Sequence, residues 1–257
     1  MIGIYLNGGL GNMMFQIAAL EDMGRRSGLQ TCYPGLDERL AILIKTANHS
    51  QNAFEYLEIF KNFDWYKNYQ DQPVFKHTFN IPHKYVRIEP MDESLYYGYF
   101  QSEMYFDRDT TLKLFEPAGH ILEVVDKYDY TNSCSIHIRR GDYVGKYKGV
   151  YYVPDCDYYN AAIDKVKASH YFVFSDDPEW CYANFEGDDF TFVGEQDYVE
   201  LFMMARCTHN IIANSSFSWW GSYLNQNPDK KIIAPSSWYL TYKYSSMDIY
   251  CNNWIII

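Results

Sequence analysis

The C-terminal half of the sequence predicts an α/β fold with a doubly wound parallel sheet, and three observations support this. Short apolar segments alternate with helical segments from residue 134 onward. Helix-capping residues stand where these helices would begin, such as Asp155, and Asp177 followed by Pro178. The N-terminus shows the same order of strand, glycine loop and helix. Such alternation is typical of a parallel sheet covered by helices.

The expected strands of this half are residues 134–138, 171–174, 190–193, 210–213 and 231–234, with helices at 155–167, from 177, at 198–206 and at 214–225. In such sheets ligands bind beyond the carboxyl ends of the strands. Those ends carry mainly polar residues, namely Arg139, Arg140, Ser175, Asp176, Gly194, Glu195, Asn214, Ser215 and Ser216.

The N-terminal half predicts a strand at 2–6, a glycine loop at 7–12 and a helix at 13–27. The loop lacks the third glycine of the dinucleotide fingerprint, and alone it is weak evidence for a site. Further helices are expected at 37–47, 52–63 and 102–115, and a strand at 85–88. The aromatic run 95–100 favours a buried strand over a sugar-stacking platform. The polar stretch 117–132 suggests two domains, residues 1–125 and 126–257, and the end of the chain is able to pack back on the N-terminal half.

Composition narrows the class of partner. The chain has 257 residues and a net charge of -11, which argues against nucleic acid and anionic lipid as partners. Six scattered cysteines show no zinc-site spacing. No secretory leader and no apolar run of about 18 residues is present, so we expect no stable membrane insertion and a cytoplasmic protein. Peripheral contact with a partner carried by a membrane is compatible with this composition.

The segment 135–143 is the main candidate for a binding site. Alternation along a strand places His137 and Arg139 on one face and Arg140 on the other. Two planar guanidinium groups at a strand end suit a phosphate or diphosphate, because they bind oxyanions bidentately. Structural salt bridges explain the same pair equally well.

Other candidates also have two readings. Ser215 and Ser216 either contact a phosphate at a helix N-terminus or cap that helix. Asp176 either accepts hydrogen bonds from a ribose or guanine or forms a turn. His137 either contacts a phosphate or ribose or is a satisfied core residue. The D-x-D strings at 107–109 and 155–157 fall at expected helix starts, where Asp is a cap.

Three stretches together resemble the α-1,2-fucosyltransferase family of bacteria and animals, which is glycosyltransferase family 11-like: GGLGNMMFQ (8–16), HIRRGDY (137–143) and NSSFSWWG (214–221). The shorter stretches GYFQSE (98–103) and FSDD (174–177) are also similar to family segments, in the same order. The resemblance spans residues 1 to 235. Met13 stands where the family usually has Gln, and the chain is short.

The resemblance implies a GT-B-like fold of two Rossmann-type halves that uses GDP-fucose as donor without a metal or other cofactor. The N-terminal half would supply most of the acceptor surface, and the C-terminal half would bind the GDP-sugar. Arg139 would hold the β-phosphate, and Asn12 would face the reacting centre. The implied donor site comprises Gly9, Gly11, Asn12, His137, Arg139, Arg140, Ser175, Asp176, Asn214, Ser215, Ser216 and Phe217.

The implied reaction is inverting transfer of L-fucose to the 2-hydroxyl of a galactose in an oligosaccharide. Arg139 and the helix after Asn214 would stabilise the charge that develops on the β-phosphate. Asp142 is the candidate base, or else it orients Arg139. Two alternatives stay open: another GDP-sugar transferase such as a protein O-fucosyltransferase-like enzyme, and a non-catalytic nucleotide-binding module.

Overall fold

The computed structural model describes residues 1–36, 59–63, 74–240 and 248–257. The chain forms two compact units, one of Met1–Gly119 with Ser246–Cys251 and one of His120–Ser245 with Asn252–Ile257. The sequence analysis predicted the boundary between the two domains after residue 125, whereas the chain passes from the first unit to the second after Gly119. In the first unit Asp248 Oδ2 accepts a hydrogen bond from the backbone N–H of Tyr85 (2.8 Å), so the late segment belongs to that fold.

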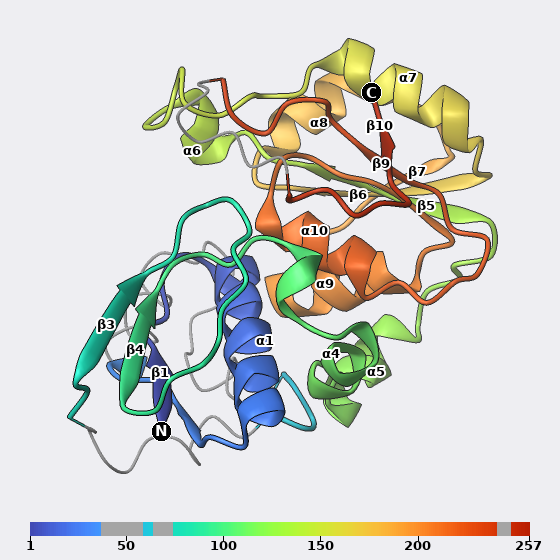
Figure 1. Ribbon diagram of the computed structural model, residues 1–257. Helices are drawn as coiled ribbons and strands as arrows, with labels where there is room; N and C mark the ends of the chain where they lie inside the picture. The colour runs from blue at the N-terminus through green and yellow to red at the C-terminus, as the bar shows by residue number, and fades with distance from the viewer. Residues whose placement is uncertain (37–58, 64–73, 241–247) are drawn as a thin grey trace. The chain divides into compact units, whose positions relative to one another are not determined.

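The second unit contains a six-stranded parallel sheet in the order β10-β9-β8-β5-β6-β7, and Figure 1 shows α7 and α8 on one side of it and α9 and α10 on the other. In chain order this is the 3-2-1-4-5-6 arrangement of a Rossmann fold, and it confirms the predicted doubly wound sheet. The strands are β5 (Ser133–Ile138), β6 (His170–Ser175), β7 (Phe190–Phe192), β8 (His209–Ile211), β9 (Ile232–Ala234) and β10 (Ile255–Ile256).

Its helices are α5 (Gly119–Val125), α6 (Gly141–Val144), α7 (Cys156–Val166), α8 (Pro178–Asn184), α9 (Asp197–Arg206) and α10 (Ser216–Tyr223). The predicted caps are confirmed: Asp155 accepts from Tyr158 N, and Asp177 accepts from Trp180 N. The sequence did not predict β10, α5 or α6. All six residues of β5 are buried, since helices cover both faces of a central parallel strand.

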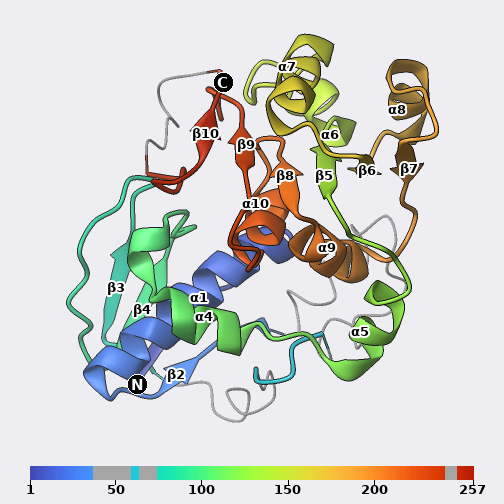
Figure 2. The same cartoon turned by 90° about the vertical axis from the view of Figure 1, so that its right-hand side faces the viewer.

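The first unit has a four-stranded parallel sheet in the order β2-β1-β4-β3, with α1 packed along it (Figure 2). Its elements are β1 (Ile2–Ile4), α1 (Leu10–Ser27), β2 (Thr31–Cys32), β3 (His77–Asn80), β4 (Ser94–Tyr97), η1 (Glu103–Tyr105) and α4 (Arg108–Leu114). Because α1 begins at Leu10, Gly11 and Asn12 are helical and not part of a loop.

Three other expectations for this unit need comment. The strand expected at 85–88 is wrong, and β3 lies at 77–80 instead. The helix expected at 102–115 is divided, because Phe106 is extended and Asp107 caps a new helix by accepting from Thr110 N (3.0 Å). The helix expected at 37–47 lies outside the described residues, as does most of the one expected at 52–63.

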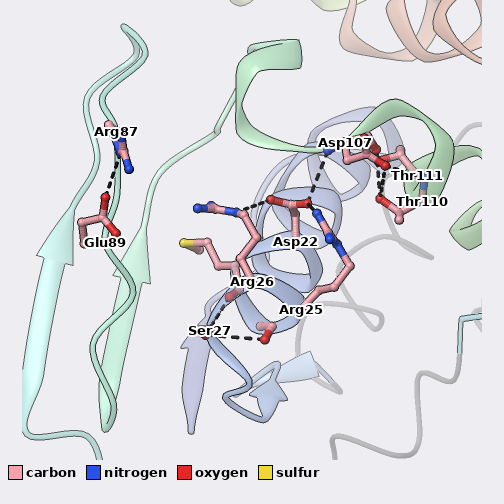
Figure 3. A network of polar contacts seen from close by, with 11 residues as sticks. Asp22, Arg25, Arg26, Ser27, Arg87, Glu89, Asp107, Thr110 and Thr111 are labelled. Atoms are coloured by element: carbon pink, nitrogen blue, oxygen red, sulfur yellow. Dashed lines mark hydrogen bonds and ion pairs between the residues drawn. The ribbon is translucent and has the colours of Figure 1, made fainter.

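The last turn of α1 is fixed by a buried carboxylate (Figure 3). Asp22 is 7% exposed and pairs with Arg25 (2.7 Å) and Arg26 (2.6 Å). It also accepts the backbone N–H of Asp107 (3.4 Å) just before α4. The predicted basic last turn therefore packs against the divided helix, and Gly28 ends α1 in the left-handed region (φ 71°).

Candidate donor site

Arg139 follows β5 directly, next to the switch point between β5 and β8 where the strand order reverses. Its Nη2 donates to Asp142 Oδ1 (2.7 Å), and its Nη1 lies 2.9 Å from Asp176 Oδ2. Burial lowers the pKa of Arg139, but Asp176 and Asp142 outweigh burial and hold that pKa above its ordinary value. The charged, planar guanidinium of Arg139 is therefore held at the carboxyl edge of the sheet, where ligands bind in such folds.

Arg140 faces different partners, as the alternation along β5 predicted. Its Nε donates to Asp177 Oδ2 (3.0 Å), and its guanidinium lies 4.6 Å from the centre of the Trp180 ring. The side chain is only 21% exposed. The two arginines are therefore not equivalent, and the contacts of Arg140 are those of a structural residue.

Two buried polar atoms flank the switch point without a hydrogen-bond partner in the described part of the chain. They are His137 Nδ1 on β5 and Asn214 Oδ1 after β8. Burial, and then the charge of Arg139, lower the pKa of His137 to about 3, so the imidazole is neutral at physiological pH. Its ring lies 5.6 Å from that of Phe217. Unpaired buried polar atoms are rare and are typical of functional sites.

The N-terminus of α10 lies at the same edge. Asn214 is fully buried and donates through Nδ2 to the Trp238 carbonyl (2.6 Å). The Ser215 hydroxyl accepts from Phe217 N (3.3 Å), so the capping role is confirmed for Ser215. Ser216 is the first residue of α10 and is partly exposed. The N–H groups of this first turn carry partial positive charge, which favours an anion.

Tyr143 connects the two strand ends. Its hydroxyl donates to the Asn214 carbonyl (3.2 Å), and its ring lies 5.5 Å from the Arg139 guanidinium and stacks on Tyr151 (4.1 Å). The sequence included Tyr143 in the motif without assigning it a role. In the sequence, only its position directly after Asp142 pointed to a role in the site.

Ser175, predicted as a donor-site residue, and Asp176, for which a ribose or guanine contact was one alternative, are turned toward neighbouring protein groups. The Ser175 hydroxyl accepts from Asp177 N (2.9 Å). Asp176 Oδ1 accepts the backbone N–H of Arg140 (2.8 Å), and Oδ2 pairs with Arg139. These contacts are those of the turn-forming alternative.

The glycine turn of the first unit places Asn12. Gly8 has φ +84°, and a Cβ on it would lie 2.3 Å from Asn12 Nδ2. Gly9 is the N-cap of α1, where a Cβ would meet nothing within 4 Å, and Gly11 is buried in the first turn. Asn12 Oδ1 accepts from Gln101 Nε2 (2.9 Å). Gly8, which the predicted site omitted, is thus the glycine that the turn requires.

An exposed tyrosine pair lies at the carboxyl edge of the four-stranded sheet of the first unit. Tyr5 follows β1 and Tyr97 ends β4, and their rings stack at 5.5 Å with an 18° interplanar angle. They are 39% and 37% exposed, although Tyr96 before Tyr97 is buried. The prediction of a buried aromatic strand is confirmed for residues 95 and 96 only.

No group of three or more His, Cys, Asp or Glu residues within the described ranges is arranged to hold a metal ion. None of the described helices is long and apolar enough to cross a membrane. The predicted site residues of the second unit gather at the β5–β8 switch point. Those of the first unit gather around the start of α1 as a separate group.

The parallel sheets and their helices give the chain a mixed α/β fold that is consistent with a GT-B-like architecture. Solved fucosyltransferase structures share this fold: NodZ from Bradyrhizobium has a TM-score of 0.54 at 12% identity, covering 86% of this chain and 90% of that one. POFUT1 in complex with GDP-fucose has a TM-score of 0.52 at 10% identity, covering 91% and 97%. The pattern of glycosyl transferase family 11 matches residues 1–257, and the chain belongs to this family of glycosyltransferases.

Curated relatives differ in name and in coverage. An alpha-1,2-colitosyltransferase of Escherichia coli is 34% identical over 62% of this chain and 61% of its own length. The O-antigen biosynthesis glycosyltransferase WbnK of Escherichia coli is 28% identical over 97% and 98%. Galactoside 2-alpha-L-fucosyltransferase Sec1 of Mus musculus is 26% identical over 87% of this chain and 64% of its own.

Proposed function

We propose that this glycosyltransferase moves L-fucose from GDP-fucose to the 2-hydroxyl of a galactose in an oligosaccharide, with inversion and without a metal ion. The observation that carries the proposal is Arg139, whose guanidinium is fixed at the carboxyl end of β5 beside the N-terminus of α10. This is the arrangement that a diphosphate leaving group needs.

In the proposed reaction, negative charge gathers on the β-phosphate as the bond between fucose C1 and its oxygen breaks. Arg139 and the first N–H groups of α10 stabilise that charge. His137 Nδ1 and Asn214 Oδ1 are buried at the same edge and lack a partner among the described residues, and we propose that binding of the donor brings a partner to them. Phe217 presents an aromatic face beside His137.

Asp142 is the candidate for the base that takes the proton of the acceptor hydroxyl. Asp142 is 38% exposed and pairs with Arg139. This contact supports the alternative role, in which Asp142 orients the arginine. An oxocarbenium-like transition state also reduces the demand on a base, because the sugar carries most of the developing positive charge.

For the acceptor, we propose that the stacked pair of Tyr5 and Tyr97 supports the sugar ring. Tyrosine faces suit the apolar faces of sugars, while their hydroxyls reach polar groups. The pair lies at the carboxyl edge of a parallel sheet, which is the edge where ligands bind in such sheets.

A second candidate is transfer of colitose, which the name of the 34% identical relative favours. The experiment that separates the candidates is a transfer assay with GDP-fucose, GDP-mannose and GDP-colitose, each offered with a panel of terminal-galactose oligosaccharides and with peptides. The proposal requires fucose on galactose O2, with an unchanged rate in excess chelator. Transfer only to peptides, only from GDP-colitose, or only with added manganese would contradict it.

A further inference from the structure

We infer that Asp176 is a positioning residue that holds Arg139 and does not read the nucleoside, and that this role requires Gly141. The inference rests on the proposed function, because it assigns a task within the same donor site. Asp176 is the first residue after β6.

Both oxygens of Asp176 contact the turn that follows β5. Oδ1 accepts the backbone N–H of Arg140 (2.8 Å), and Oδ2 lies 2.9 Å from Arg139 Nη1. The side chain is only 13% exposed. A carboxylate that reads a ribose or a guanine has to turn its oxygens toward the ligand, whereas this one turns both toward the two arginines.

The second carboxylate on Arg139 differs in its setting. Asp142 comes from the same turn as Arg139 and is 38% exposed, so water screens its charge more than that of Asp176. Asp142, Asp176 and Asp177 together outnumber the two guanidinium groups. Arg139 uses one N–H of Nη1 and one of Nη2 on Asp176 and Asp142, and a diphosphate that approaches it competes most easily with the more exposed of the two. We expect it to displace Asp142, while Asp176 keeps the guanidinium in place.

Gly141 makes this arrangement sterically possible. A Cβ at Gly141 would lie 2.5 Å from Asp176 Oδ2, closer than real Cβ contacts come. The backbone of Gly141 does not need a glycine, since its φ is not positive. The contact is with the far end of a flexible side chain, so an added methyl would rotate the Asp176 carboxylate away without disturbing the fold.

The test is calorimetric titration of GDP and of GMP into the full chain, with the wild type, Asp176→Asn, Gly141→Ala and Gly145→Ala. The last variant is the matched control, because a Cβ at Gly145 meets only the Gly141 carbonyl oxygen at an ordinary 3.6 Å. GMP lacks the β-phosphate that Arg139 is proposed to bind. Thermal melts of all four proteins accompany the titrations.

We expect Asp176→Asn and Gly141→Ala to weaken GDP binding by about tenfold or more, as the loss of a charged hydrogen bond does. GMP binding should stay within about twofold, and Gly145→Ala should match the wild type. Equal losses for GDP and GMP would show that Asp176 reads the nucleoside or only supports the fold, and unchanged GDP binding in Gly141→Ala would also overturn the inference.

Failure of the proposed function looks different. If the wild type binds GDP no more tightly than GMP, or transfers no fucose, the proposed function falls and this inference falls with it. If the wild type transfers fucose and the variants lose GDP and GMP binding equally, only the inference about Asp176 is overturned.

Discussion

Replacing the buried carboxyl of Glu200 by an amide should stabilise the protein at neutral pH. Glu200 lies on α9 and is 8% exposed. Burial, and then the charges of Asp197 and Glu195, raise the pKa of Glu200 to about 8 from an ordinary 4.5. A raised native pKa means that the stability due to this group is full below pH 4.5 and is lost as the pH rises through about 8.

The magnitude follows from the size of that shift. Each pKa unit corresponds to about 1.4 kcal/mol, so between pH 4.5 and pH 7 the contribution of Glu200 to stability falls by on the order of 3 kcal/mol. Glu200→Gln cannot ionise, and it keeps an oxygen that can accept the Glu195 backbone N–H as the carboxylate does. The variant should therefore gain up to that amount at pH 7.

The assay is urea unfolding followed by tryptophan fluorescence at pH 5, 6, 7 and 8. The advantage of Glu200→Gln in free energy of unfolding should grow with each step in pH. Glu186→Gln, which removes an exposed carboxyl after α8, serves as the control and should show no such trend. An advantage that is constant or that shrinks with pH would refute the reasoning about the buried carboxyl.

Three further predictions concern the site. Gly8→Ala should lower the free energy of unfolding by roughly 2 kcal/mol and reduce transfer, because Gly8 has a positive φ and approaches Asn12. Gly9→Ala should lower it by about 1 kcal/mol or less. Thermal melts and initial rates check both variants. The lowered pKa of His137 predicts that the contribution of this imidazole to stability falls by about 1.4 kcal/mol per pH unit as the pH falls from 6 to 4, so in urea titrations the wild type should lose that much relative to His137→Gln. Tyr97→Ala should raise KM for the acceptor roughly 2- to 10-fold and leave KM for the donor unchanged, and an equal effect on both would contradict a sugar platform.

Local signals explain what the sequence could predict. Asp155 and Asp177 begin helices because their side chains accept hydrogen bonds within three residues, which the sequence displays directly. The doubly wound sheet was predicted from alternating apolar segments, and the arginine pair followed its strand at the expected edge. The placement of Arg139 and Arg140 on different partners followed from strand alternation alone.

Contacts between distant segments explain what the sequence could not predict. Asp176 meets Arg140 across 36 residues through the pairing of β5 with β6, so its partner is decided by the sheet. Strand β10 has two exposed residues and forms only by pairing with β9. The break after η1 is a different case, because its signal is local: Asp107 caps α4 by accepting from Thr110 N three residues downstream but lies inside a longer helical pattern, which was predicted as one helix.

The central claim is that Arg139 stabilises the charge on the leaving diphosphate. The most direct measurement is kcat/KM for fucose transfer by Arg139→Ala beside the wild type, with a thermal melt of each protein. The account predicts a loss of roughly 100- to 1,000-fold with a retained cooperative melt, as removal of one donor to a developing oxyanion gives in other enzymes. A folded Arg139→Ala variant that keeps wild-type kcat/KM would contradict it.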